Sequence, residues 1–142
     1  ADYLRRLRND PEARKNFFYG SPVGKKAHIL WLRGAVRSAN RRVYVAEAQT
    51  LSGMPIPGVP VGTGRLDFNG ATVELSLNVD PEYRGKGYGK DIVAALTQAA
   101  REWKPGIPLI AHVKAFNTAS LRAFLRAGFA VKGTRCLNLE AR

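Results

Sequence analysis

The sequence predicts one α+β domain over residues 1–142, with helices packed on a mostly antiparallel sheet. A length of 142 residues suits a single core, and 45% hydrophobic with 24% charged residues is typical of a globular chain. The predicted elements run helix, helix, three strands, helix, strand, helix and two strands, so several strands follow one another directly. Asn69-Gly70 lies between two strand-like runs and is a strong hairpin signal, which makes that pair antiparallel.

The first part of the chain is predicted to be helical. Residues 2–18 place apolar side chains on one face, and Pro11 after Asp10 indicates a helix stop and restart. After a turn, residues 25–38 carry a broad apolar side that predicts a longer amphipathic helix.

The middle of the chain predicts three strands. Residues 42–48 are rich in β-branched side chains. Residues 51–62 hold three prolines and three glycines, which argue against a helix or a central strand, so we expect a long loop there. Strands are expected over 64–68 and 71–79, and in the second of these polar and apolar residues alternate, giving one polar face.

The last third alternates between helices and strands. The predicted elements are a helix over 87–103, a strand over 108–114, a helix over 117–127, and strands over 129–132 and 135–139.

Charge and cysteine content limit the function classes. The formal net charge is +12, and residues 1–42 hold 11 Lys/Arg against 3 Asp/Glu, which suits an anionic partner or a basic surface. The sequence argues against nucleic acid, because it has no long basic run and no aromatic RNA-binding signature. A single cysteine, Cys136, excludes an internal disulfide framework and a cysteine-based zinc site, and we expect no metal. No apolar run is long enough for a membrane span, so we expect a cytoplasmic protein.

A glycine-rich segment, Arg84-Gly85-Lys86-Gly87-Tyr88-Gly89, separates a predicted strand from a predicted helix. Glycines with positive φ expose backbone N–H groups, and a helix N-terminus favours an anion, so this segment predicts a phosphate site. It is neither a Walker A loop nor a dinucleotide fingerprint. The former would need Gly in place of Arg84 and Ser or Thr in place of Asp91, and the latter would need Gly in place of Lys90.

Two segments carry a family resemblance. Arg84-x-x-Gly87-x-Gly89 and, after the next strand, Asn117-x-x-Ser120-x-x-x-Phe124-x-x-x-Gly128-Phe129 resemble the GNAT family of N-acetyltransferases. The resemblance covers roughly residues 3–140 and implies one acetyltransferase domain with the GNAT fold. That fold has about six or seven strands, about four helices and a V-shaped opening between the fourth and fifth strands.

The resemblance also implies acetyl-CoA as the co-substrate. Backbone groups of the 77–79 segment would pair with the pantetheine arm, and the amides of the glycine loop would hold the pyrophosphate. The expected coenzyme A-binding residues are Leu77, Asn78, Val79, Arg84, Gly85, Lys86, Gly87, Tyr88, Gly89, Lys90, Asn117, Ser120 and Phe124.

The chemistry implied is direct attack of an amine on the thioester in a ternary complex. Glu74, on the polar face of its strand, is the candidate general base, with His28 and His112 as alternatives. We expect His112 to be a packed strand histidine. The oxyanion donor would be the backbone N–H of Val79 or Asn78.

The leaving group is where the sequence departs from the family pattern. Phe124 replaces the usual tyrosine acid and has no proton to give. The thiolate could leave unprotonated, or Ser120, Tyr83 or water could protonate it, so the acid is unassigned. Cys136 has no evident nucleophile setting and is interpreted as structural.

The acceptor is specified more weakly. Leu7-Arg8-Asn9-Asp10-Pro11-Glu12 with His28-x-x-Trp31 resembles the branch that acetylates nucleotide-linked amino sugars of the pseudaminic acid type, although Arg8–Pro11 also reads as a helix stop and restart. This implies substrate binding by Arg8, Asn9, His28 and Trp31, and a small amine that is anionic overall. We also expect residues 51–62 to line or cover the acceptor site.

Two other functions stay open. One is acetylation of a protein N-terminus or lysine, and the other is a non-catalytic module that binds acetyl-CoA or nucleic acid. The sequence also leaves open whether the chain forms a homodimer.

Overall fold

The computed structural model describes residues 1–51, 53–133 and 137–141, and its elements follow the predicted order. Five α-helices lie in these ranges, one more than the four or so expected. They are α1 (Asp2–Asn9), α2 (Pro11–Asn16), α3 (Lys25–Arg37), α4 (Tyr88–Trp103) and α5 (Thr118–Arg126), with a 3-10 helix at Pro81–Tyr83. The predicted restart at Pro11 is confirmed, because the Asp10 side chain accepts a hydrogen bond from the Ala13 amide and caps α2.

The strands form one mixed sheet in the order β1-β2-β3-β4-β6-β5. They are β1 (Arg41–Leu51), β2 (Met54–Phe68), β3 (Val73–Val79), β4 (Leu109–Val113), β5 (Phe129–Val131) and β6 (Leu137–Ala141). Among the strand pairs of the described residues only β3–β4 is parallel, so the prediction of an α+β fold with a mostly antiparallel sheet is confirmed. The Asn69-Gly70 hairpin is confirmed between β2 and β3. Arg135 and Cys136 lie outside the described residues.

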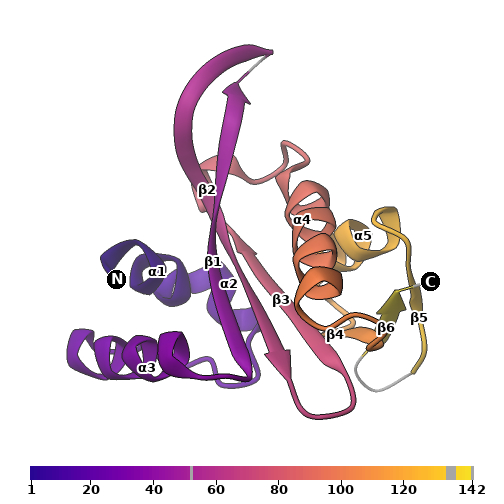
Figure 1. Cartoon of the computed structure of the whole chain (residues 1–142). Helices are drawn as coiled ribbons and strands as arrows, with labels where there is room; N and C mark the ends of the chain where they lie inside the picture. The colour runs from indigo at the N-terminus through magenta and orange to yellow at the C-terminus, as the bar shows by residue number, and fades with distance from the viewer. Residues whose placement is uncertain (52, 134–136, 142) are drawn as a thin grey trace.

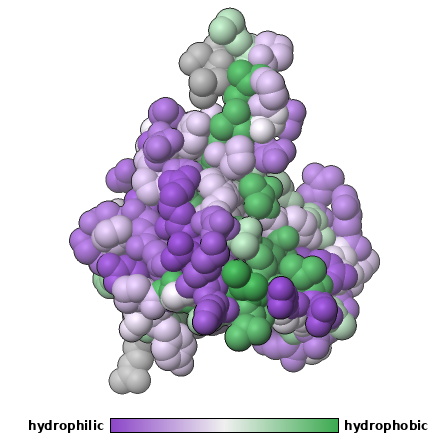
Figure 2. All heavy atoms as spheres, turned by 90° about the vertical axis from the view of Figure 1, so that its left-hand side faces the viewer, coloured by the Kyte–Doolittle hydropathy of each residue, from purple (hydrophilic) through white to green (hydrophobic). Residues whose placement is uncertain are grey.

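The prediction of a long loop over 51–62 is wrong. Residues 54–61 extend β2, which pairs with β1 as far as Leu51↔Met54, and this hairpin projects beyond the rest of the domain (Figures 1 and 2). The prolines are tolerated because β3 pairs only with residues 62–68, so residues 54–61 have a strand neighbour on one side alone. Two register shifts between β1 and β2 absorb the remaining irregularity.

Helices cover both faces of the sheet. Helix α4 packs on β2 and β3 on one side, whereas α1 and α3 lie against β3 and β1 on the other (Figure 1). The face with α1, α2 and α3 is largely hydrophilic (Figure 2), as expected from the basic first third of the chain. None of the helices in the described ranges combines the length and apolar character needed to cross a membrane.

The core lies mainly between α4 and the sheet. Leu66 of β2 and Val73 of β3 are fully buried there, with Val93 and Ala100 of α4 above them. Burial of these apolar side chains is the main force that holds α4 on the sheet. The opposite face of β3 is left to polar side chains, which form the site described next.

Candidate active site

Strands β3 and β4 begin as neighbours and then separate. Their parallel pairing contains only Val73↔Leu109 and Glu74↔Ile110, although β3 continues to Val79 and β4 to Val113. The expected V-shaped opening is therefore present, but it lies between the third and fourth strands of this chain and not between the fourth and fifth.

One edge of β3 presents backbone N–H groups to this opening. The Val73 amide donates to the Pro108 carbonyl on the β4 side, and the Asp80 amide donates to the Val61 carbonyl of β2. Because N–H groups alternate between the two edges of a strand, those of Leu77 and Val79 point toward the opening and that of Asn78 points toward β2. Of the two oxyanion donors considered, the geometry favours Val79.

A cavity of about 710 Å³ occupies the opening and continues beneath the N-terminal helices. This volume is within the usual range for small-molecule sites. Its walls come from α1, the segment after α2, α3, β1 to β4 and α5. The polar side chains that line it are Arg8, Asn16, Tyr19, His28, Thr63, Arg65, Glu74, Ser76, Asn78, His112, Lys114, Asn117 and Ser120.

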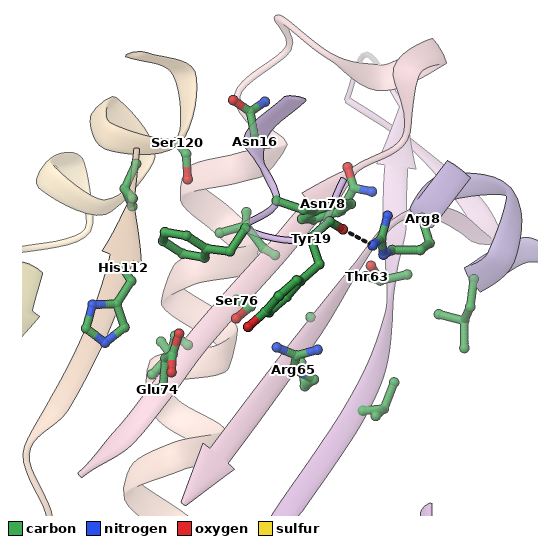
Figure 3. Close-up of a pocket in the computed structure, with 18 of the residues that line it drawn as sticks. Arg8, Asn16, Tyr19, Thr63, Arg65, Glu74, Ser76, Asn78, His112 and Ser120 are labelled. Carbon is green, nitrogen blue, oxygen red and sulfur yellow. Dashed lines mark hydrogen bonds between the residues drawn. The ribbon is translucent and has the colours of Figure 1, made fainter. Parts of the chain in front are cut away.

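Glu74 and His112 face the same part of this cavity (Figure 3). Glu74 is the register partner of Ile110, and His112 follows two residues later, so both side chains lie on one face of the sheet. His112 is exposed, so the expectation of a packed strand histidine is wrong. The cavity thus contains a carboxylate and an imidazole on its two opposing strands.

The glycine loop has the backbone that an anion site requires. Gly85 and Gly87 have φ values of 75° and 87°, and Gly87 is the N-cap of α4. The first N–H groups of α4 have no acceptor within the helix, and Arg84, Lys86 and Lys90 are exposed around them. This end of α4 can hold a phosphate group by its amides.

Two ion pairs tie the loop to the N-terminal helices. Asp80, 1% exposed, accepts a hydrogen bond from Arg6 at 2.7 Å, and Arg84 donates to Asp10 at 2.7 Å. Burial alone would raise the pKa of Asp80, but the bonds from Arg6 and the Glu82 amide outweigh it and leave that pKa lowered. The loop and α1 are therefore fixed relative to each other.

The predicted acceptor residues Arg8 and Asn9 occupy different places. Arg8 lines the cavity, and its guanidinium lies 4.4 Å from the Phe17 ring centre and donates to the Tyr19 carbonyl (Figure 3). Asn9 is turned away from this cavity: its side-chain amide bonds both backbone groups of Val23, at 2.8 and 2.9 Å. Asn9 therefore holds the segment before α3 in place.

His28 and Trp31 both line the cavity from α3. His28 is 4% exposed, its ring centre lies 5.5 Å from that of Trp31, and burial lowers its pKa, with nearby positive charges adding to the effect. His28 is therefore neutral near pH 7 and can accept or donate a hydrogen bond there.

Comparison with known proteins identifies the family. The model of the acetyltransferase (GNAT) family matches residues 5–129. The chain belongs to the GNAT family. It is 33% identical over 104 residues to the L-amino acid N-acyltransferase MnaT of Escherichia coli. The matched segment covers 66% of this chain and 60% of MnaT. It is 30% identical over 127 residues to the L-methionine sulfoximine/L-methionine sulfone acetyltransferase of Pseudomonas paraeruginosa. That match covers 81% of this chain and 72% of the other protein.

Solved structures confirm the GNAT-like fold. A domain from Methanocaldococcus jannaschii superposes with a TM-score of 0.81 at 17% identity, covering 99% of this chain and 90% of that one. The spermidine N-acetyltransferase of Vibrio cholerae, solved with coenzyme A and spermine, gives a TM-score of 0.77 at 14% identity, covering 98% and 85%. At these identities the likeness concerns the fold alone.

The second GNAT motif lies on the α5 side of the opening. Asn117 caps α5, accepting from the Ser120 amide at 3.2 Å, and both side chains line the cavity. Phe124 is 1% exposed, also borders the cavity, and meets Phe129 edge-on with ring centres 5.0 Å apart. The position of the usual GNAT tyrosine is therefore apolar in this chain.

Sequence reasoning missed several polar residues of the site. Arg65 and Tyr19 line the cavity, and Asp80 anchors the loop to α1. The sequence did contain a signal for Asp80, because an Asp directly before Pro81 at the end of a strand is typical of a residue that caps a helical turn. Arg65 and Tyr19 carried none, because the fold alone brings β2 and the segment after α2 together.

Proposed function

We propose that this GNAT domain transfers an acetyl group from acetyl-CoA to the primary amine of a small acceptor, by direct attack in a ternary complex. The observation that carries the proposal is the parting of β3 from β4 beside the N-terminus of α4. The residues present fit coenzyme A, because one strand edge offers amides to an extended arm and the glycine loop offers amides to a pyrophosphate.

In this proposal Glu74 accepts a proton from the acceptor ammonium, directly or through water, which frees the lone pair for attack on the thioester carbon. The Val79 N–H then stabilises the oxyanion of the tetrahedral intermediate. Collapse of that intermediate breaks the C–S bond and releases the thiolate of coenzyme A, and the attacking nitrogen gives up its remaining extra proton to water or to the thiolate, so that a neutral amide forms. Phe124 cannot protonate the thiolate, so the thiolate leaves unprotonated or takes a proton from Ser120, which lines the cavity, from Tyr83 or from water.

The acceptor in this proposal is a small amine with an anionic group. The named relatives act on amino acids or on methionine sulfoximine and sulfone, all of which carry a carboxylate. A nucleotide-linked amino sugar is a second candidate, supported by the N-terminal resemblance and the basic face. A protein acceptor is less suited, because Arg8, Tyr19, His28 and Trp31 line the cavity on the side of the N-terminal helices.

Acetyl-CoA turnover against a panel of amines, amino acids, amino-sugar nucleotides and peptides tests the proposal. Glu74→Gln should lower kcat about 10²- to 10⁴-fold and leave the Kd for acetyl-CoA unchanged, since the carboxylate handles the proton alone. Glu102→Gln, on an exposed part of α4, is the matched control. Full activity of Glu74→Gln would exclude Glu74 as the base. Tight acetyl-CoA binding without turnover of any acceptor would instead favour a non-catalytic binding module.

A further inference from the structure

Arg8 places a desolvated cation in the acceptor half of the cavity. Its Nη1 atom is buried and has no hydrogen-bond partner among the described residues, while its Nη2 atom donates to the Tyr19 carbonyl. Burial lowers the pKa of Arg8, and the positive charges of Arg14 and Arg65 lower it further. A guanidinium that gives up water without gaining an anion is unfavourable, so this arrangement favours a negatively charged ligand group.

Asp67 and Asp10 are engaged with other arginines, and Glu74, which lines the same cavity, forms no ion pair among the described residues. Asp67 pairs with Arg65, with a 2.6 Å separation, and with Arg41 as well. Asp10 pairs with Arg84. In the described part of the chain no carboxylate forms an ion pair with Arg8. The positive charge of Arg8 is therefore not neutralised by a carboxylate in the described residues.

Arg8 lies near the end of β3, on the side where the acceptor is proposed to bind. The carbonyl of Leu7, its neighbour in α1, accepts a hydrogen bond from the Asn78 side chain at 2.8 Å. Arg8 thus sits over the end of β3 that also carries the Val79 N–H (Figure 3 shows Arg8 near Asn78 and Thr63). An anion bound to Arg8 would therefore lie near the last residues of β3.

We propose that Arg8 binds the α-carboxylate of an amino acid acceptor, and that this contact sets the acceptor class of the site. In an α-amino acid the carboxylate is two bonds from the amine nitrogen, which suits the closeness of Arg8 to the Val79 end of β3. In a nucleotide-linked amino sugar the diphosphate is separated from the amine by the sugar ring. The inference rests on the N-acetyltransferase function proposed above.

The test compares L-amino acids, including L-methionine sulfone, with the corresponding carboxamides as acceptors. The unsubstituted protein should prefer the acid in kcat/KM, and Arg8→Gln should reduce that preference about 10- to 100-fold, the range for a hydrogen bond to a charged group. Arg8→Lys should retain part of it. Arg37→Gln, an exposed arginine of α3 outside the cavity lining, should leave it unchanged.

The ratio of acid to carboxamide separates carboxylate binding from a structural role, because loss of the Phe17 and Tyr19 contacts would affect both acceptors alike. An equal loss on both would overturn the inference and leave the proposed function intact. A preference for 2-aminoethyl phosphate that disappears in Arg8→Gln would also overturn it, in favour of phosphate. No turnover of any amine would instead refute the proposed function.

The unsubstituted protein provides a test that does not depend on how the variants fold. With acetyl-CoA or coenzyme A present, an L-amino acid should raise the Tm more than its carboxamide does, since it gains the Arg8 contact. An equal shift from both would count against carboxylate binding at Arg8.

Discussion

Gly87→Ala tests whether the left-handed backbone of the glycine loop is required. Gly87 has φ 87° and caps α4, and a Cβ added there meets nothing within 4 Å. Gly24 offers a matched control, because it caps α3, has φ −69° and also has open space around an added Cβ. The two substitutions add the same methyl group and differ in backbone conformation.

The expected difference follows from that conformation. An L-residue in the left-handed region costs roughly 1 to 2 kcal/mol, whereas Ala at φ −69° is unstrained and narrows the unfolded ensemble. For a domain of this size, about 1 kcal/mol corresponds to roughly 3 to 4 °C in Tm. Gly87→Ala should therefore lower the Tm by about 3 to 8 °C relative to Gly24→Ala.

Thermal unfolding without ligand and titration with acetyl-CoA measure the two consequences. Strain in the loop should lower the Tm, and any relaxation of the loop should turn its amides and weaken acetyl-CoA binding by about tenfold or more. Gly24→Ala should bind normally. The reasoning is refuted if the two variants have equal Tm values and equal Kd values for acetyl-CoA.

Two further substitutions test the contacts that hold the N-terminal helices. Asp80→Asn should lower the free energy of unfolding by about 2 kcal/mol at pH 7, because a charge-assisted bond to Arg6 is lost. The pKa of Asp80 is lowered in the fold, so its contribution is lost as the pH falls below about 4, and the two proteins should converge there; a constant difference would contradict this. Lys114→Met removes the bonds from Nζ to the carbonyls of Lys15 (3.0 Å) and Phe17 (2.8 Å), which join β4 to the end of α2. Amide hydrogen exchange over residues 13–20 should accelerate, and unchanged exchange would show that other contacts hold this segment.

The fold could be predicted largely because its signals are local. Asp10-Pro11 specified a helix restart, Asn69-Gly70 a hairpin, and the glycine loop a strand-to-helix junction. The prediction failed at residues 51–62, where proline content was interpreted without knowing which strand edge was paired. Proline excludes pairing only on the side to which its nitrogen points. Whether a neighbouring strand lies on that side depends on how many strands extend to that point of the sheet.

The candidate site was predictable to the extent that it depends on motifs. Arg84–Lys90 and Asn117–Phe124 were identified because GNAT proteins repeat that spacing. Glu74 was found from alternation along one strand. Arg65 was missed and His112 was expected to be packed, because their positions depend on β2, β3 and β4 being neighbours, and pairing between strands distant in sequence leaves no local pattern.

The segment Arg8-Asn9-Asp10 shows why a short motif can serve several functions at once. Its three side chains point in three directions: Arg8 toward the cavity, Asn9 to the backbone of Val23, and Asp10 to the Ala13 amide and Arg84. Asp10 thereby joins the acceptor helices to the loop predicted to hold coenzyme A. Because one nitrogen of the Arg84 side chain is already engaged by Asp10, we expect the proposed pyrophosphate site to depend mainly on the loop amides and on Lys86 and Lys90. In the proposed function the acceptor and coenzyme A subsites would share one anchoring residue, so we expect a change at Asp10 to disturb both, whereas a change at Arg8 should affect the acceptor alone.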